Sequence, residues 1–286
     1  MSATASGHIE ISNLGVVFGQ NGLAVEAVRN VSLTVEPGQF VSLIGPSGCG
    51  KSTLLNIVAG FQKPTQGTAL FDGKAIDRPG SDRGVVFQQY SLFPWLTVRK
   101  NVEFGLRVQG MPQSTRETTA RTLLGLAGLL SFENLYPDQL SGGMKQRVGI
   151  VRALATSPQV MLMDEPFGAL DSQTRTVMQE ILTNMWQRFR LSVLFVTHDI
   201  EESIFLSDKI YVMTARPGSI KAEITVPLAR PRTPQMMSTR AFLDLKVELQ
   251  SLIREESLIA MGGELKDGGL DGFGTEVGPS GVKSVV

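Results

Sequence analysis

The sequence contains very few residues of the kinds that build disulfide-rich or metal-rich proteins. Its 286 residues include one cysteine, Cys49, and two histidines, His8 and His198. A single cysteine excludes an intrachain disulfide and a cysteine-rich metal site, and two histidines cannot form a histidine cluster. The chemistry of the chain must therefore depend mainly on other side chains.

The chain also lacks an excess of charge and any long apolar run. Lys and Arg number 27, as do Asp and Glu, so no overall basic field indicates nucleic acid as a partner. No run of about 18 apolar residues is present, and the N-terminal MSATASGHIE has no basic segment followed by an apolar one. We therefore expect neither a membrane-spanning helix nor a secretory signal. The composition predicts a soluble cytoplasmic protein.

Apolar segments alternate with helical patterns along the chain, which predicts an α/β protein with a mostly parallel sheet. Residues 8–18 predict a strand, and residues 25–38 predict a strand pair that ends in a turn at Pro37-Gly38. Further short or buried strands are predicted at 39–45, 67–73, 83–89, 160–166 and 191–199.

Helical patterns occupy the intervening parts of the sequence. Helices are predicted at 52–60, where Gly60 supplies the stop, within 97–155 and around 172–189. In the second of these segments, one apolar helix face is formed by Ala120, Leu123, Leu124, Ala127 and Leu130. Ordinary core packing is the simplest interpretation of that face.

The C-terminal part adds two strands, a helix and a glycine-rich end. Residues 210–217 and 220–228 predict a pair of edge strands. After Pro234, an amphipathic helix is predicted by Phe242, Leu245, Leu249, Leu252 and Ile253. The glycine-rich remainder has no periodicity, and we expect residues 261–286 to be a disordered tail.

The strongest motif is the glycine-rich turn GPSGCGKS at residues 45–52. It matches GxxxxGK[ST], follows a predicted strand and precedes a predicted helix, which is the context of a phosphate-binding loop. Glycines let the backbone wrap closely round phosphates, and a helix N-terminus favours an anion. Lys51 would reach the β- and γ-phosphates of a nucleotide, and Ser52 would bind Mg²⁺. The alternative is a structural glycine-rich loop, in which Cys49 is a small filler rather than a redox group.

Two carboxylates, Asp164 and Glu165, end the predicted strand 160–166. In a parallel sheet this end of a strand faces the ligand crevice. Because adjacent strand residues point to opposite sides, Asp164 would support Mg²⁺ while Glu165 polarises an attacking water. The alternative is that one of the two carboxylates caps the next helix.

His198 and Gln88 end two further predicted strands. Because the strand ends of one parallel sheet lie near each other, His198 would contact the γ-phosphate or hold the water. Gln88 would sense Mg²⁺ or water. The alternatives are a satisfied structural histidine and a glutamine that caps a loop.

A second helix start that suits an anion lies at LSGGMKQR, residues 140–147. Ser141 is predicted to be the N-cap, followed by Gly142 and Gly143. Met144 stands where a polar side chain would complete a capping box, so that the second hydrogen bond of such a box is lost.

The segments GPSGCGKST, VFQQ, LSGGMKQR, MLMDEP, GALD and VTHD together resemble the nucleotide-binding domain of ABC (ATP-binding cassette) transporters. Their order and spacing match over roughly residues 8–225, and this combination is far more specific than a phosphate-binding loop alone. The resemblance implies a P-loop NTPase fold with a mostly parallel core sheet, an N-terminal antiparallel β subdomain and an α-helical subdomain. It implies a cassette at 8–230 with its helical subdomain at about 90–155, and a C-terminal helical appendage at 231–260.

The resemblance implies an ATPase that uses ATP and Mg²⁺, and it assigns roles by position. Catalytic roles are implied for Lys51, Gln88, Glu165 and His198, of which Glu165 would be the base and His198 the switch histidine. Binding of Mg²⁺ is implied for Ser52, Gln88 and Asp164.

Nucleotide contacts are implied for three motifs and one aromatic residue. The motifs are the Walker A loop, the signature motif and the D-loop, with residues Gly45, Pro46, Ser47, Gly48, Cys49, Gly50, Lys51, Ser52, Thr53, Ser141, Gly142, Gly143 and Asp171. Phe18 falls where the family often places an aromatic residue that stacks on adenine. A core phenylalanine of an edge strand is the alternative.

In this family two cassettes pack head to tail, with ATP between the P-loop of one and the signature helix of the other. The sequence has one copy of each motif. The resemblance therefore implies a second ATP-binding subunit, which would be a second copy of this chain in a homodimer with two ATP sites.

The resemblance also implies membrane partners. The segment YSLFPWLTVRKNV at 90–102 lies where the family receives the coupling helix of a membrane subunit. Phe93, Pro94 and Trp95 would suit a hydrophobic groove there, or Trp95 packs in the core. The chain would bind separate permease subunits at the cytoplasmic side of the inner membrane, and would work indirectly with an extracytoplasmic solute-binding protein.

Finer detail resembles one branch of the family. FPWLTVRKNVEFGL, MDEPFGALD and TARPGSI are similar to the branch that handles nitrate, sulfonates, taurine and related small solutes. We therefore expect the ATP-hydrolysing subunit of a bacterial importer for such a solute. The alternative is a soluble ABC-type ATPase that is not coupled to transport.

Overall fold

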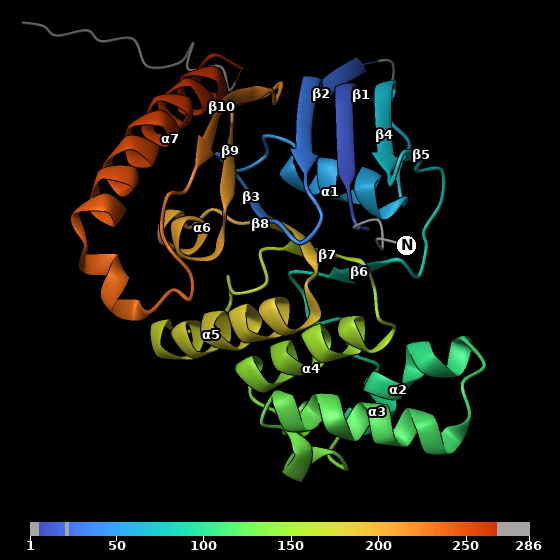
Figure 1. Cartoon of the computed structure of the whole chain (residues 1–286). Coiled ribbons are helices and arrows are strands. Elements are labelled where there is room, and N and C mark those ends of the chain that lie inside the picture. The colour runs from blue at the N-terminus through green and yellow to red at the C-terminus, as the bar shows by residue number, and fades with distance from the viewer. Residues whose placement is uncertain (1–5, 21–22, 268–286) are drawn as a thin grey trace, which may run out of the picture.

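Two β-sheets and a set of helices make up the protein (Figure 1), in a computed structural model that describes residues 6–20 and 23–267. The strands are β1 (Ile9–Gln20), β2 (Leu23–Val35), β3 (Phe40–Ile44), β4 (Gln66–Phe71), β5 (Lys74–Ala75), β6 (Arg83–Val86), β7 (Val160–Asp164), β8 (Ser192–Val196), β9 (Lys209–Met213) and β10 (Ile220–Thr225). The α-helices are α1 (Lys51–Ala59), α2 (Val98–Val108), α3 (Gln113–Leu126), α4 (Gly142–Ala155), α5 (Ser172–Phe189), α6 (Ile200–Leu206) and α7 (Arg240–Asp267). Short 3-10 helices occupy Leu130–Phe132, Pro137–Gln139 and Pro234–Ser238.

The larger sheet has the strand order β10-β9-β3-β8-β7-β6. Its strands pair in parallel except for β10, which is antiparallel to β9 at the edge. The smaller sheet, β2-β1-β4-β5, is antiparallel throughout. The predicted α/β fold, with a mostly parallel core sheet and an N-terminal antiparallel sheet, is therefore confirmed.

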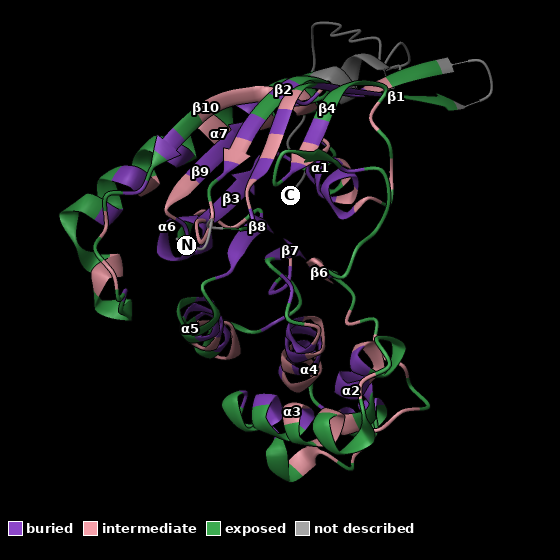
Figure 2. Cartoon of the chain, turned by 45° about the vertical axis from the view of Figure 1, so that its right-hand side comes forward, coloured by how far each residue is buried: buried purple, intermediate pink, exposed green. Residues whose placement is uncertain are grey.

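The central strands are buried on both faces, which explains their unbroken apolar sequences. Because side chains alternate along a strand, Phe40 and Ile44 of β3 enter the core beneath the helices. Val41 and Leu43 enter a second core, which β3 shares with α1 and the smaller sheet. Figure 2 shows buried residues concentrated along β3, β7 and β8, and many exposed ones along α3.

One N-terminal prediction was wrong in detail. The segment 25–38 forms the single long strand β2 rather than a strand pair, and β2 ends before the predicted turn at Pro37-Gly38. Leu14 and Val16 of β1 are two positions apart, but their partners in β2, Val31 and Val28, are three positions apart. The extra residue forms a bulge, and Asn30 within it adopts a φ of +48°. A bulge absorbs an extra residue without reversing the chain.

The helical region contains α2, α3 and α4, which lie together at the lower end of the molecule in Figure 1. Ala120, Leu123 and Leu124 are buried as predicted. Leu130 is 44% exposed, so its assignment to the same helix face was wrong. The helix α3 stops at Leu126, and Gly128, with a φ of +67°, turns the chain out of the helical path.

The C-terminal helix α7 packs against α6 and β9 through the predicted apolar face. Phe242, Leu245 and Leu249 are buried. The helix continues to Asp267, so residues 261–267 are helical rather than part of a disordered tail. The remainder of the predicted tail, 268–286, lies outside the described residues.

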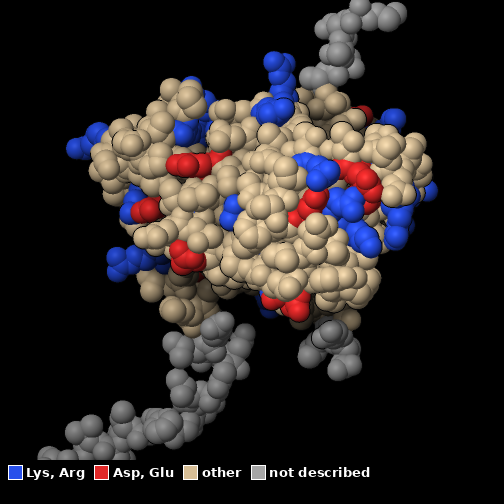
Figure 3. All heavy atoms as spheres, turned by 90° about the horizontal axis from the view of Figure 1, so that it is seen from below, with Lys and Arg blue, Asp and Glu red and all other residues tan. Residues whose placement is uncertain are grey.

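Charged side chains of both signs are interspersed on the face seen from below in Figure 3. This agrees with the balanced composition of the chain. Among the described residues no helix has the length and apolarity needed to cross a bilayer.

Candidate functional site

The turn between β3 and α1 has the geometry of an anion-binding loop. Gly48 and Gly50 have φ values of +74° and +98°, a region that side chains disfavour. A Cβ atom on Gly50 would lie 2.6 Å from Cγ2 of Val28, so the loop also needs glycine for space. Gly50 caps α1 without any side-chain hydrogen bond. The N-terminus of α1 is therefore left to attract a negatively charged group.

Lys51 lies inside this loop and is only 6% exposed. Its Nζ atom donates hydrogen bonds to the carbonyl oxygens of Gly45 and Pro46, at 2.8 and 2.9 Å. The ammonium group is thus held at the centre of the loop. Cys49 is buried beside it, and burial raises the pKa of its thiol, which agrees with a packing role rather than a reactive one.

Ser52 connects the loop to the end of β7. Its Oγ atom donates to Oδ1 of Asp164 across 3.2 Å. Burial raises the pKa of Asp164, while the hydrogen bond from Ser52 lowers it in part. A hydroxyl and a carboxylate in contact are the hard oxygen ligands that Mg²⁺ prefers, so these two residues fit the ion.

Glu165 lies just beyond β7, with a φ of +44°. Its N–H donates to the carbonyl oxygen of Val196 at the end of β8, at 2.9 Å. Its Oε2 atom lies 3.1 Å from Nδ1 of His198 and accepts from Nε2 of Gln88 at 3.4 Å. Three predicted residues from the ends of β6, β7 and β8 therefore meet at one carboxylate.

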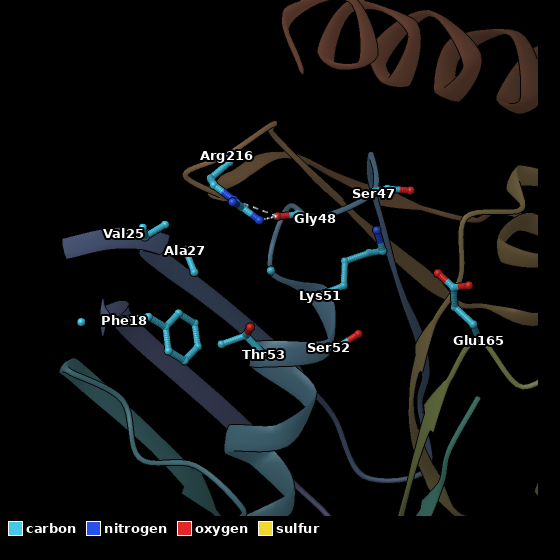
Figure 4. Close-up of a pocket in the computed structure, with 12 residues that line it drawn as sticks. Phe18, Val25, Ala27, Ser47, Gly48, Lys51, Ser52, Thr53, Glu165 and Arg216 are labelled. Carbon is cyan, nitrogen blue, oxygen red and sulfur yellow. Dashed lines mark hydrogen bonds between the residues drawn. The ribbon is translucent and has the colours of Figure 1, made fainter. Parts of the chain in front are cut away.

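A cleft of about 640 Å³ adjoins the loop. It is lined by Phe18, Gly19, Val25, Ala27, Ser47, Gly48, Gly50, Lys51, Ser52, Thr53, Glu165 and Arg216. Figure 4 shows Phe18 at one end and Glu165 at the other, with the loop and Lys51 between them. Phe18 is 43% exposed, so the alternative of a core phenylalanine does not hold. An aromatic face, a phosphate-binding loop and a carboxylate in this order match the base, phosphates and water of a nucleotide reaction.

The predicted cleft residues are thus largely brought together, although not all of them line the cleft. Gly45, Pro46 and Cys49 form the buried part of the loop behind it. Sequence reasoning did not assign Val25, Ala27 or Arg216 to this site. Val25 pairs with Phe18 across β1 and β2, so strand alignment would have found it. Arg216 lies in the segment TARPGSI, which indicated a branch of the family but no nucleotide contact.

The signature residues lie away from this cleft, at the start of α4. Ser141 is the N-cap, as predicted, and its Oγ accepts from the N–H of Met144 at 3.3 Å. Met144 packs its side chain, partly buried, against the core instead of closing the cap. A Cβ atom on Gly142 would lie 2.8 Å from the hydroxyl of Tyr90, and Gly143 is buried. Ser141, Gly142 and Gly143 do not line the cleft of their own chain.

Asp171 also lies outside the cleft, as the N-cap of α5. Its carboxylate accepts from the N–H of Thr174 at 3.0 Å, and this hydrogen bond lowers the pKa of Asp171. The Asp171 side chain is thereby ionised and pinned to the start of the helix.

A partly buried network involves the residues on either side of His198. Glu202 accepts from Oγ1 of Thr197 at 2.8 Å, and Arg175 contacts Asp199 at 3.0 Å and Glu202 at 3.5 Å. Burial raises the pKa of Glu202 to about 7. The residues on both sides of His198 are therefore tied to α5 and α6.

A loop that closes round a lysine between a parallel strand and a helix, with carboxylates at the next strand ends, defines a P-loop nucleoside-triphosphate-binding protein. Residues 28–168 match the family model described as ABC transporter. The chain belongs to the ATP-binding cassette family of ABC transporters, and it is an ATPase of that class.

Curated relatives and solved structures agree with this assignment. The chain is 49% identical over 254 residues to the nitrate import ATP-binding protein NrtD of Synechocystis sp., covering 86% of this chain and 95% of that protein. It is 44% identical over 251 residues to the taurine import ATP-binding protein TauB of Rhizobium johnstonii, covering 86% and 96%. A dimeric structure of a post-hydrolysis state of the ATP-binding cassette MJ0796 bound to ADP and Pi matches with a TM-score of 0.69 and 34% identity, over 77% of this chain and all of that one.

Proposed function

We propose that the chain is the ATP-hydrolysing subunit of an importer for a small solute such as nitrate, a sulfonate or taurine. Two relatives named for nitrate and for taurine import, each of which this chain covers almost completely, support the solute class. They also favour a transport role over a free-standing ABC-type ATPase. The solute does not contact a nucleotide site, so the cleft residues do not identify it. The proposed solute class depends on shared ancestry with these relatives.

One observation carries the proposal that the working unit is a dimer. The cleft contains Lys51 and Phe18, whereas Ser141 and the glycines that follow it start a helix elsewhere on the chain. Each feature is suited to an anion, yet one chain does not bring them together. A second copy placed head to tail would set the signature helix of one chain over the cleft of the other.

The roles of the cleft residues follow from their contacts. Lys51, held by Gly45 and Pro46, neutralises the β- and γ-phosphates as a point charge. Glu165 orients and polarises the attacking water, and His198 and Gln88 fix the direction of its carboxylate. In phosphoryl transfer such positioning and electrostatic stabilisation account for most of the catalysis.

Ser52 and Asp164 are the residues that would hold Mg²⁺, together with Gln88, whose amide contacts the adjacent Glu165. Among the described residues no group of three or more His, Cys, Asp or Glu side chains could hold a metal ion alone. This agrees with an ion that takes only one or two carboxylate ligands and completes its shell with water and phosphate oxygens. When bound, Mg²⁺ would neutralise charge on the phosphates.

The partners in the membrane would be permease subunits, served by a solute-binding protein on the other side. Trp95 is 71% exposed, which excludes the alternative that it packs in the core. Its ring lies 5.6 Å from that of Phe93, which in turn packs on Phe104 at 4.4 Å. An exposed aromatic surface of this kind suits a helix of a membrane subunit, and the chain would thus sit peripherally at the cytoplasmic side of the inner membrane.

Dimer formation can be tested directly. The variant Glu165→Gln should bind ATP without hydrolysing it, and in sedimentation with Mg²⁺ and ATP it should form dimers. Adding Ser141→Arg to it would place a bulky cation at the predicted interface and should leave monomers, while nucleotide binding to the open cleft persists. Monomers of the Glu165→Gln variant under all conditions would contradict simple self-association.

The solute class needs a separate experiment. A strain that lacks this gene should lose uptake of labelled nitrate or of labelled taurine, and complementation with the intact chain should restore it. Complementation with Trp95→Ala should fail while the purified variant keeps its ATPase activity. Normal uptake of both solutes in the deletion strain would contradict the proposed branch, but not the ATPase assignment.

A further inference from the structure

The loop between β9 and β10, residues 214–219, lies directly against the phosphate-binding loop. The N–H of Gly218 donates to the carbonyl oxygen of Ala27 at 2.9 Å, and the N–H of Arg29 donates to that of Gly218 at 2.9 Å. A Cβ atom on Gly218 would lie 1.8 Å from the carbonyl oxygen of Cys49. We call residues 214–219 the strap, because they connect β9 and β10 at the edge of the large sheet and also bond to β2 beside the phosphate-binding loop.

The strap places one cation at the cleft. The Nε and Nη2 atoms of Arg216 both donate to the carbonyl oxygen of Gly48, each at 3.3 Å. Figure 4 shows the guanidinium group beside Gly48, on the opposite side of the loop from Glu165. Arg216 also lines the cleft, so its charge adds to that of Lys51.

The strap is in turn held by the C-terminal helix. Glu256 of α7 is 5% exposed, and its Oε2 atom accepts from the N–H of Ala215 at 2.8 Å. Its Oε1 atom accepts from Nζ of Lys221 on β10 at 2.6 Å. The carboxylate of Glu256 therefore binds the residue that immediately precedes Arg216.

We propose that α7 sets the nucleotide affinity of the cleft by holding the strap, through the chain of contacts Glu256–Ala215 and Arg216–Gly48. This gives the C-terminal helix, which lies outside the segment matched by the family model, a part in ATP binding that is transmitted through the strap. The inference rests on the nucleotide cleft and is independent of the transported solute.

Two physical effects make the chain of contacts effective. The guanidinium group fixes the direction of the Gly48 carbonyl, and with it the orientation of the peptide that follows. This contact pre-organises the loop for phosphate and lowers the cost of ordering it on binding. The fixed positive charge of Arg216 at the edge of the cleft also attracts the polyanionic nucleotide. Arg216 is thus a positioning residue that also contributes charge.

The geometry explains why Glu256 matters more than its neighbour. Glu255 shares the same partner, since Lys221 donates to its Oε2 atom at 2.6 Å, but its side chain is 66% exposed. Glu255 has no hydrogen bond to the strap among the described residues. Removing Glu256 leaves the N–H of Ala215 without its buried acceptor, whereas removing Glu255 breaks only an exposed ion pair.

Binding of a fluorescent ADP analogue to the full-length chain tests the proposal. Glu256→Ala should weaken binding about tenfold, because nucleotide binding must then order the released strap and loop. Glu256→Gln keeps an acceptor for the N–H of Ala215 and should bind nearly as the parent chain does. Glu255→Ala is the matched control and should leave binding unchanged.

Arg216 is tested in the same assay. Arg216→Ala should weaken binding about tenfold or more, and should raise the KM for ATP with little change in kcat. Arg216→Lys should restore part of the affinity through its charge. Arg254→Ala removes an exposed arginine of α7 and should have no effect.

The double variant distinguishes one chain of contacts from two separate effects. If Glu256 acts through Arg216, then Glu256→Ala combined with Arg216→Ala should bind no more weakly than Arg216→Ala alone. Additive losses, or unchanged nucleotide affinity in Glu256→Ala, would overturn the proposal. If Glu256→Ala does not fold, unchanged affinity in Arg216→Ala would overturn it equally.

Discussion

Oε2 of Glu165 and Nδ1 of His198 lie 3.1 Å apart, although 33 residues separate them in the sequence. Each follows a strand of the parallel sheet, β7 and β8, and the backbone of Glu165 is bonded to the end of β8. Gln88 approaches the same carboxylate oxygen at 3.4 Å. Two polar side chains from neighbouring strand ends therefore fix the direction in which the Glu165 carboxylate points.

The first prediction concerns the base. Glu165→Gln keeps the size of the side chain and an oxygen for these contacts but loses the negative charge. ATP hydrolysis should fall by at least about 100-fold, because general-base catalysis is worth that much or more, while nucleotide binding should persist. Phosphate release and equilibrium binding measure the two effects, with the exposed Glu223→Gln as control. Near-normal hydrolysis would show that Glu165 is not the base.

The second prediction concerns the histidine. His198→Ala removes one of the two groups that orient Glu165, and kcat should fall by about 100-fold with a smaller change in KM. His8→Ala is a natural control, since His8 lies at the start of β1, near Glu36 and not at the cleft. The idea would fail if both variants turned over ATP at similar rates.

The third prediction concerns the signature helix. Met144 packs against the core, and Ser141 alone caps the helix. Met144→Gln should therefore change ATPase activity only a few-fold, whereas Ser141→Ala should also lose about 1 kcal/mol of stability through the missing cap. Steady-state ATPase assays and urea unfolding measure these effects. A Met144→Gln variant with background activity would contradict this account of the cap.

The fourth prediction concerns pH. Burial raises the pKa of Glu202 to about 7, from 4.5 in an exposed chain. Between these values the folded chain holds a proton that the unfolded chain has lost, so the free energy of unfolding should fall as pH rises from about 4.5 to 7. The loss attributable to this group is on the order of 3 kcal/mol.

Urea unfolding at pH 5 and pH 8 would measure this dependence. Glu202→Gln should be less sensitive to pH than the parent chain, because the amide does not titrate. Glu201→Gln, a change at the adjacent and more exposed carboxylate, should retain the parent pH dependence. Equal pH dependence in all three chains would contradict a buried, protonated Glu202.

Much of the site could be predicted from short segments. The phosphate-binding loop, the strand-end carboxylates and the capping serine each depend on a few adjacent residues, and each is placed as those residues indicate. One error arose from a local stop that the spacing pattern did not take into account. Leu130 has the spacing of a buried helix residue, but Gly128 ends the helical path before it.

Arg216 is the clearest residue that sequence reasoning missed. It is 168 residues from Gly48, and nothing adjacent to it suggests a role at a nucleotide. Its contact exists because β9 pairs with β3, whose end leads into the phosphate-binding loop. Sheet order, rather than local pattern, therefore brought it to the cleft.

By itself the sequence determined the class of the protein, the alternation of strands and helices, and the position of the glycine-rich loop between a strand and a helix, because these depend on periodicity and on motifs of a few residues. Only the tertiary structure decided that Glu165, His198 and Gln88 share one point, that Trp95 faces solvent, and that Glu256 reaches the strap. These contacts join distant segments, and their geometry is set by strand order and helix packing, which no single segment specifies.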